Sequence, residues 1–479
     1  MLKHRTLSIL SRSGVLAALS ILFCVPLFAQ DYSYYAYKQN KEAYSQPLSV
    51  LLENARQDLK IEIVCDKNVD PFLNQTVPMA PWKFWDDPEL RLAYILAPLD
   101  LTFEKTGERS YRVFEPWYQN RPESEGAAHL QRLLARFPDK ETWETRKAAL
   151  RASLLEKLNL SPMPPKTDSE PIYTEKRSYD GYTVENVALE IIPGYWLSGS
   201  LYRPTEGQAP YPVIASPHGH LDVGRLDPNN QYRAATLARM GAIVFSYSMF
   251  AWIEDETPLK RADHRNPISG TMQTLSSIRV LDFLTALPDA DASRVGMTAC
   301  SGGGTQTFLA TALDDRVTVP VPVVMVSSYF FGGCPCESGL PIHTVEGGTC
   351  NAEIAAMAAP RPMLLVSDTQ DWTKNTPEVE YPYIKKIYEY YGAGDKLENV
   401  HLDEPHDYGP SKRAAMYPFM AKYLGLDVSR ADESKVTIES KEQMLVFGLN
   451  HEKYPENGIQ NIDDLIRSFN EYKAANAPK

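Results

Sequence analysis

The feature that most constrains the fold is a strand–serine–glycine–helix turn. The run Arg294-Val-Gly-Met-Thr-Ala-Cys-Ser-Gly-Gly-Gly304 reads as an apolar strand ending at Cys300, and residues 305–313 are typical of a helix. Such a turn holds a serine in a strained conformation with its hydroxyl exposed, and it needs very small neighbours. The usual form is Gly-x-Ser-x-Gly; Ala299 replaces the first glycine and Gly303 keeps the second. We interpret Ser301 as a nucleophile rather than an incidental serine in a glycine-rich turn.

Two later strands supply partners for this serine. Residues 361–371 form an apolar strand that ends in acids, and His406 lies just beyond the strand that starts at Leu397. Serine, acid and histidine at the ends of successive strands is the α/β-hydrolase order. A serine hydroxyl needs a neutral imidazole to accept its proton, and the imidazole needs a carboxylate to orient it. The sequence therefore predicts a triad of Ser301, Asp371 and His406, with Glu337 as an alternative acid.

An apolar strand at 213–216 runs into Pro-His-Gly-His220, where this fold places the loop that donates one N–H to the oxyanion. The other donor follows the nucleophile. We therefore expect an oxyanion hole made by Gly302 with Gly219 or His220. Three residues on loops at the same end of the sheet are candidates for binding a sugar face or a uronate carboxylate: Arg225, Trp252 and Trp372.

Four cysteines fall close together and are candidates for disulfides around the active site: Cys300, Cys334, Cys336 and Cys350. Four cysteines allow three pairings, so connectivity stays open, and a bond from Cys300 to the 334–350 loop is one arrangement. A metal is not expected, because His218 and His220 show no third ligand nearby and Cys-Pro-Cys is too tight for ordinary zinc ligation. The expected chemistry needs no cofactor.

The chain divides by texture into five parts. After residues 1–29 comes a small α+β unit over 47–115, with helical spacing at 48–59, a strand at 61–64, a second helix at 88–96 and a hairpin at 101–114. Residues 116–170 read as a helical linker. Over 171–430 short apolar runs alternate with helices, which predicts a largely parallel sheet covered by helices. Residues 431–479 read as an appendage with strand-then-helix texture.

The first thirty residues are typical of a secretory signal peptide. Lys3, Arg5 and Arg12 precede an apolar run that ends near Ala29, where we expect cleavage. The predicted location is the periplasm, the cell surface or the medium, where disulfides persist. The formal net charge of the 479 residues is -12, which excludes a nucleic-acid binder, because such a protein needs a basic face.

Several motifs carry a resemblance. Ser301-Gly-Gly-Gly, Ala359-Pro-Arg-Pro, Asp371-Trp-Thr and His406-Asp-Tyr-Gly resemble secreted bacterial carbohydrate esterases of the α/β-hydrolase superfamily. They are similar to the acetyl xylan esterase and dienelactone-hydrolase-like branch and to related pectin methylesterases. Glucuronoyl esterases of this type can place their acid where Glu337 lies. The small unit over 47–115 resembles the short N-terminal domain of secretins and TonB-dependent transporters, which implies contact with an envelope protein.

We therefore expect a secreted serine esterase that removes O-acetyl groups or uronate methyl esters from plant-type polysaccharides or oligosaccharides. The acidic charge favours acetylated neutral glycans slightly over an anionic polymer. A pectin or uronate methylesterase, a secreted serine peptidase of the same fold and an inactive envelope-binding protein are the alternatives.

Overall fold

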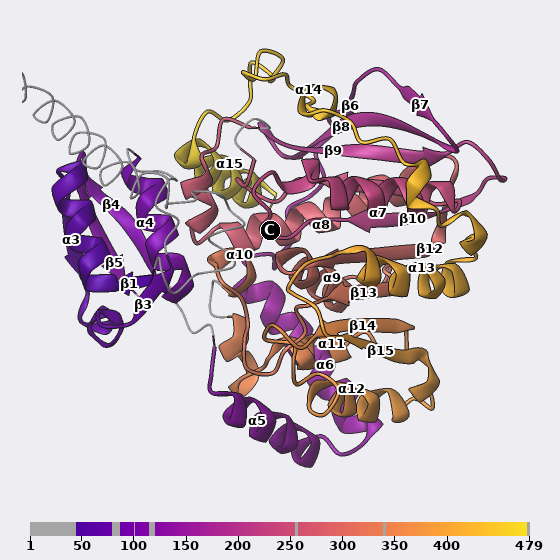
Figure 1. Cartoon of the computed structure of the whole chain (residues 1–479), viewed down its shortest axis with the longest axis horizontal. Helices are drawn as coiled ribbons and strands as arrows, with labels where there is room; N and C mark the ends of the chain where they lie inside the picture. Colours follow the sequence, from indigo (N-terminus) through magenta and orange to yellow (C-terminus); the bar gives the residue numbers. More distant parts are fainter. Residues whose placement is uncertain are drawn as a thin grey trace, which may run out of the picture. The chain divides into compact units, whose positions relative to one another are not determined.

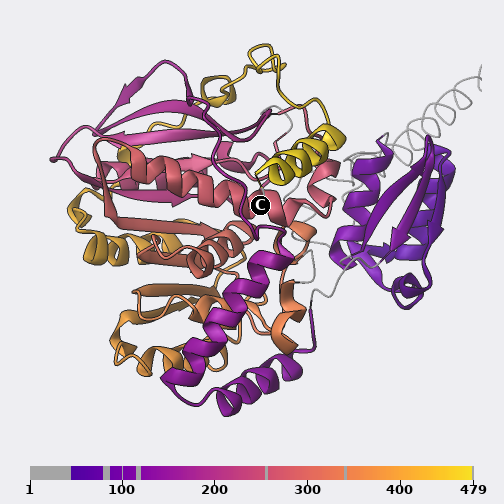
Figure 2. The ribbon, with the colours of Figure 1, turned by 180° about the vertical axis from the view of Figure 1, so that it is seen from behind.

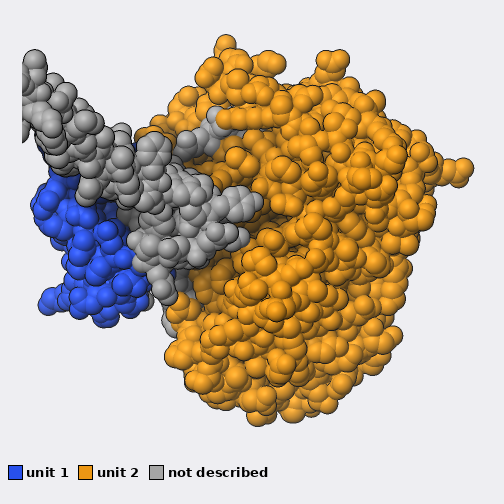
Figure 3. Space-filling model, viewed as in Figure 1, with its two compact units in different colours: residues 1–115 blue, residues 116–479 orange. Residues whose placement is uncertain are grey.

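The computed structural model describes residues 45–78, 87–99, 101–114, 120–253, 257–338 and 342–476. The chain forms two compact units, Met1–Glu115 and Pro116–Lys479 (Figure 3). The expected leader over 1–29, with its cleavage point near Ala29, lies outside the described residues. Within the described ranges, no helix combines the length and the apolar character needed to cross a membrane.

The small unit is an α+β fold around a three-stranded sheet (Figure 1). β2 (Glu62–Cys65) pairs in parallel with β5 (Ser110–Phe114), which pairs antiparallel with β4 (Thr102–Gly107). Helices α3 (Leu48–Leu59) and α4 (Pro88–Leu96) share its core, and β1 (Ser45–Pro47) and β3 (Thr76–Pro78) form a separate ribbon. The helical spacing predicted for α3 reflects burial in this core. Five apolar residues at intervals of one to four are buried on one face of the helix: Leu48, Leu51, Leu52, Ala55 and Leu59.

The large unit is built on a ten-stranded sheet. Its order is β15-β14-β13-β12-β10-β11-β9-β8-β6, with β7 paired to β8. The strands are β6 (Ile172–Tyr173), β7 (Arg177–Tyr179), β8 (Tyr182–Ile192), β9 (Tyr195–Pro204), β10 (Tyr211–Ser216), β11 (Ile243–Tyr247), β12 (Ala290–Cys300), β13 (Val319–Val323), β14 (Met363–Asp368) and β15 (Leu397–Leu402).

The pairing of these strands fixes where a site can form. β10 to β15 pair in parallel, whereas β6 to β9 form an antiparallel edge. The strand order reverses at β10, because the chain next adds β11 on one side of it and β12 on the other. In open α/β sheets ligands bind outside the carboxyl ends of the strands at such a reversal. The loops after β10 and β12 therefore meet at the expected position.

Helices cover both faces of the sheet. α7 (Pro228–Arg239) and α13 (Pro410–Leu424) share one core with Ile214 and Val244. The neighbouring Val213 and Phe245 point to the opposite face, as the alternation of a strand requires, and share a second core. Four helices contribute to that second core: α8 (Ser269–Ala286), α9 (Gly302–Leu313), α11 (Asn351–Ala356) and α12 (Glu380–Glu389). Figure 2 shows the molecule from behind.

Residues 120–158 are helical but are not a free linker. α5 (Glu123–Arg136) and α6 (Lys140–Lys157) belong to the large unit. Trp143, Leu150 and Leu154 of α6 are fully buried in the core of the sheet's second face. Arg146 donates to both carboxylate oxygens of Glu353 at 2.9 Å, and both side chains are buried. The helices expected over 116–170 are α5 and α6, and the apolar stripe of α6 faces the main core.

The carboxyl-terminal segment also packs onto the large unit. The strands expected there are absent from the described residues: residues 436–440 form no regular element and α14 (Lys441–Met444) follows them. The expected helix is α15 (Ile462–Ala475). Leu465 and Phe469 of α15 join the main core. Arg413 of α13 holds the start of the segment through two hydrogen bonds of 2.6 Å to Glu433.

The Arg146–Glu353 pair gives a test of how firmly α6 belongs to the catalytic unit. Glu353→Gln leaves the Arg146 charge buried without a counter-charge, so we expect the free energy of unfolding to fall by about 3–5 kcal/mol. The control is Glu389→Gln, which removes an exposed pair with Lys386 and should cost less than about 1 kcal/mol. Urea denaturation measures both. Equal losses would show that α6 is only loosely attached.

Candidate active site

Ser301 lies at the junction of β12 and α9 in a conformation that few residues adopt. Its φ is 56° and its ψ is -129°, a backbone geometry that stores strain and that persists only where the surroundings enforce it. Its N–H donates to the carbonyl of Val323 on β13, 3.1 Å away, and its carbonyl accepts from Thr305 in α9 at 3.0 Å. The sequence prediction of a sharp strand-to-helix turn is thus seen in the structure.

The second glycine after this serine, Gly303, is required by packing. A Cβ on Gly303 would lie 2.5 Å from the Cβ of Ala299 and 2.8 Å from the carbonyl carbon of His218, closer than any real contact. Gly303 therefore lets the turn close against both β12 and the loop that follows β10. Ala299 fits because its methyl group occupies the space that Gly303 leaves open.

The loop after β10 packs directly on the serine. A Cβ on Gly219 would lie 2.9 Å from the Cβ of Ser301. His218 anchors this loop: its Nε2 accepts from the N–H of Met249 at 2.9 Å, so its proton is on Nδ1, which donates to the carbonyl of Gly219 at 2.7 Å. Burial lowers the pKa of His218 to about 3, so the ring stays neutral. The loop expected to supply an oxyanion donor thus lies beside Ser301.

His406 and Asp371 form a close pair. The Nδ1 atom of His406 donates to Oδ2 of Asp371 at 2.5 Å, and Oδ1 of Asp371 accepts from the backbone N–H and the hydroxyl of Thr373. Burial alone would raise the pKa of Asp371, but the hydrogen bonds from His406 and Thr373 hold it below its usual value. An ionised carboxylate at Nδ1 leaves Nε2 of His406 free of that bond, as a general base requires.

Glu337 lies elsewhere in the site. It is on α10 (Pro335–Ser338) and is buried. One carboxylate oxygen accepts from the N–H of Gly333 at 2.7 Å, and the other lies 4.0 Å from Nδ1 of His220. Burial raises the pKa of Glu337 to about 7. Of the two acids left open by the sequence, Asp371 is the one in contact with His406.

A third acid, Asp368, braces the strand end from which Asp371 projects. It ends β14, is fully buried, and its Oδ2 lies 3.3 Å from Nζ of Lys412 in α13. Lys412 also donates to Asp407 at 2.8 Å, next to His406. Burial and the charge of Asp371 raise the pKa of Asp368 to about 6. Lys412 thus links the two loops that carry the acid and the histidine.

The three candidate substrate-binding residues have different positions. Arg225 is fully buried and donates to Ser200, Ser248 and the carbonyl of Met444, so the expectation that it binds substrate is corrected: it braces the interior. The ring of Trp372 lies 4.4 Å from that of His406. The ring of Trp252 lies 4.7 Å from that of His220, and its indole N–H donates to Leu221.

The cysteines pair differently from the arrangement suggested above. Cys334 and Cys336 are joined, with a sulfur–sulfur distance of 2.24 Å, whereas Cys300 and Cys350 are free and buried. Burial raises the pKa of Cys300 to about 11 and that of Cys350 to about 12. A bond from Cys300 to the 334–350 loop is therefore absent, and Cys300 fills the core next to Ser301.

His264 was not singled out from the sequence. It lies in the 3₁₀ turn Arg261–Arg265, and its Nε2 is 3.1 Å from Nε2 of His220. Both rings face Cys334, at 3.2 Å and 3.4 Å from its sulfur. The expectation that His220 lacks further ligand groups is overturned by this cluster. No local signal marks it, because 44 residues separate the two histidines.

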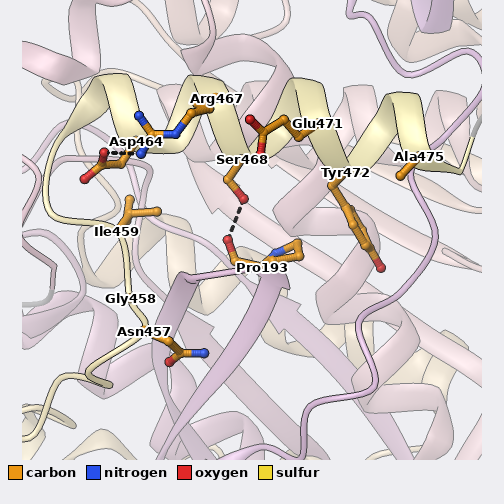
Figure 4. A pocket seen from close by; sticks show the side chains of 10 residues that line it. All are labelled: Pro193, Asn457, Gly458, Ile459, Asp464, Arg467, Ser468, Glu471, Tyr472 and Ala475. Atoms are coloured by element: carbon orange, nitrogen blue, oxygen red, sulfur yellow. Dashed lines mark hydrogen bonds and ion pairs between the residues drawn. The ribbon is translucent and has the colours of Figure 1, made fainter.

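A surface pocket is seen between α15 and the β8–β9 turn (Figure 4). Pro193 and Tyr472 line it, and the hydroxyl of Ser468 donates to the carbonyl of Pro193 at 2.6 Å. None of its lining residues belongs to the proposed catalytic groups. We assign it no catalytic role.

The sheet order and the place of Ser301 at the end of a central parallel strand define the α/β-hydrolase fold. One solved structure, Methylesterase BT1017, shares 37% sequence identity, covers 92% of this chain and 99% of its own, and gives a TM-score of 0.72. The chain belongs to the family of that protein. It is a carboxylic ester hydrolase of the carbohydrate-esterase type.

More distant structures are also similar. Glucuronoyl Esterase from Solibacter usitatus shares 15% identity over 59% of this chain and 93% of its own, with a TM-score of 0.42. Acetyl xylan esterase from Paenibacillus sp. R4 shares 19% over 57% and 94%, with a TM-score of 0.41. At these scores they add nothing to the assignment. No family model and no curated protein matches the chain.

The two acids can be separated by their effects on kcat. Asp371→Asn keeps the shape of the site but removes the charge that orients His406, so we expect kcat to fall by about 10³–10⁴-fold. Glu337→Gln should lower it at least ~10²-fold less, because Glu337 contacts His220 rather than His406. Initial rates on a soluble aryl ester measure both variants, with thermal melts as the folding control. Equal losses would contradict a single orienting carboxylate.

Proposed function

We propose that this chain is an exported methylesterase that removes methyl groups from esterified uronates in a polysaccharide or its oligosaccharides. The observation that carries the proposal is the 37% identity to Methylesterase BT1017 across almost the whole of both chains. Because the match covers both units and not only the hydrolase fold, it favours a methyl ester over the acetyl ester that the sequence alone slightly favoured.

The charge of the chain is compatible with such a substrate. The formal net charge is -12, so an anionic polymer would be repelled. A methyl-esterified uronate carries no charge at the ester that is attacked. Hydrolysis creates a carboxylate, and the acidic protein then favours release of the product. The negative net charge of the chain is therefore consistent with binding of the uncharged ester and release of the charged acid.

The proposed mechanism uses residues that follow the carboxyl ends of β10, β12, β14 and β15. His406, oriented by Asp371, accepts the proton of Ser301 as its hydroxyl oxygen attacks the ester carbonyl. The N–H of Gly302 and an N–H of the loop at Gly219 and His220 stabilise the oxyanion. His406 then protonates the departing methoxide, and methanol leaves. Water, activated by His406, hydrolyses the uronyl-enzyme and regenerates Ser301.

Trp372 and Trp252 remain the proposed substrate-contacting residues. Trp372 stacks on Phe330, with ring centroids 4.2 Å apart, and flanks His406. A flat indole next to the reacting centre suits the apolar face of a pyranose ring. The small unit over 47–115 is proposed to contact an envelope protein, as its sequence resemblance implies.

The type of ester can be identified by the small product that the enzyme releases. Purified enzyme should release methanol from a methyl-esterified polyuronate and little acetate from acetylated xylan. Ser301→Ala should reduce methanol release by at least about 10³-fold, because the covalent route is lost. Methanol and acetate are quantified in parallel digests. Acetate release that outpaces methanol release across a panel of glycans would contradict the methyl-ester assignment.

Export can be tested on the chain itself. Expression of the full sequence in a Gram-negative host should yield a mature protein in the periplasm or medium whose amino terminus lies near Gln30. Intact-mass and amino-terminal peptide analysis measures this. A retained leader, or a lipid attached to Cys24 within the leader, would contradict cleavage near Ala29.

A further inference from the structure

Four side chains from three separate segments direct nitrogen and sulfur atoms to one point beside the active site. They are His220 from the loop after β10, His264 from the 3₁₀ turn, and Cys334 and Cys336 at α10. Their ligand atoms all lie within 4.8 Å of one another. Nε2 of His220 lies 3.2 Å and 3.3 Å from the two sulfurs and 3.1 Å from Nε2 of His264.

The groups that face the second nitrogens of the two histidines fit metal ligands. Nδ1 of His264 faces the carbonyl of Phe250 at 2.5 Å; a carbonyl only accepts, so the proton is on Nδ1 and Nε2 presents a lone pair. Nδ1 of His220 lies on the side of the Glu337 carboxylate, 4.0 Å from its nearer oxygen, which is beyond direct hydrogen-bond distance. Metal-bound histidines usually direct their second nitrogen to a carbonyl or carboxylate in this way. With its proton toward Glu337, His220 would present a lone pair to that of His264, which is unfavourable unless a cation lies between them.

Burial and donor chemistry indicate the ion. His264, Cys334 and Cys336 are all almost completely buried, as in closed structural metal sites. Two thiolates and two neutral imidazoles around a divalent ion sum to zero charge, which suits a dry interior. The Cys-Pro-Cys spacing argued against zinc in the sequence, and the sulfurs are joined in the structure. Their Cα atoms are nevertheless 5.4 Å apart, and both sulfurs face the two histidines, so the opened side chains can reach one ion. Thiolate and imidazole donors in a four-coordinate site are typical of zinc.

We propose that Cys334 and Cys336 in their thiol form, together with His220 and His264, bind one Zn²⁺. Binding displaces one proton from each thiol and transfers no electron. Cysteines enter the chain as thiols, so binding needs no reductant and only has to precede oxidation. The ion protects the pair from closing into a disulfide.

The site acts by positioning the oxyanion loop. A Cβ on Gly302 would lie 2.7 Å from Cε1 of His220, so this ring packs directly against the residue that follows the nucleophile. Zinc holds that ring to the turn at His264 and to α10. The ion thereby fixes the loop at Gly219, and it takes no part in the attack on the ester.

The test uses the full chain purified with a phosphine reductant. We expect about one zinc per chain by elemental analysis. After exchange into Co²⁺, thiolate-to-cobalt charge-transfer bands and strong tetrahedral d–d bands should appear. His264→Ala and Cys336→Ser should each lower metal content and remove the tetrahedral spectrum. Cys65→Ser and His401→Ala are matched controls outside the cluster and should keep both.

Three results would overturn the site: free thiols by titration with no bound zinc, a cobalt spectrum without thiolate bands, or a cysteine pair that stays oxidised in the folded, reductant-treated chain. Metal content that is unchanged in His264→Ala and Cys336→Ser would also overturn it. Ser301→Ala should lose ester hydrolysis and keep its zinc. Failure of the zinc site and failure of the proposed esterase activity are therefore distinguishable.

Discussion

The strained backbone at Ser301 is the constraint on which the rest of the site depends. A positive φ at a serine is unfavourable, and here it is enforced from both sides: the N–H is held by Val323 on β13, and the carbonyl begins α9. The turn closes only because Gly219 and Gly303 let two backbone segments approach where a side chain would collide. The sheet and its loops thus supply the energy that keeps the hydroxyl exposed to a substrate.

Ion pairs with at least one buried partner fix the positions of segments farther from Ser301. Arg146 with Glu353 fixes α6 to the catalytic core, Arg413 with Glu433 fixes the carboxyl-terminal segment, and Lys412 with Asp368 links the loops of the acid and the histidine. Each pair joins segments that are distant in sequence. Such pairs add modest net stability, but they penalise any arrangement that leaves one charge alone. They therefore select one position for α6, for the carboxyl-terminal segment and for the loops of Asp371 and His406.

The sequence predicted those features that are encoded locally. The strand-to-helix turn, the parallel sheet and the positions of Asp371 and His406 at strand ends all follow from short patterns. Contacts between residues that are far apart in sequence could not be predicted in this way. Arg225 looks like a free loop cation, yet the fold buries it against Ser200 and Met444. The pairing of Cys334 with Cys336, and the approach of His264 to His220, depend on how loops cross in space, which no spacing rule encodes.

Ala299 has a consequence for recognising relatives of this chain. The space beside the nucleophile turn accommodates one methyl group, and only the first of the two flanking positions can carry it, because the second is also closed by His218. The two glycines of the usual motif are therefore unequal: the second is a steric necessity and the first is a preference. A search pattern that demands glycine at both positions would pass over enzymes built like this one, whereas a pattern that admits alanine before the serine would retain them.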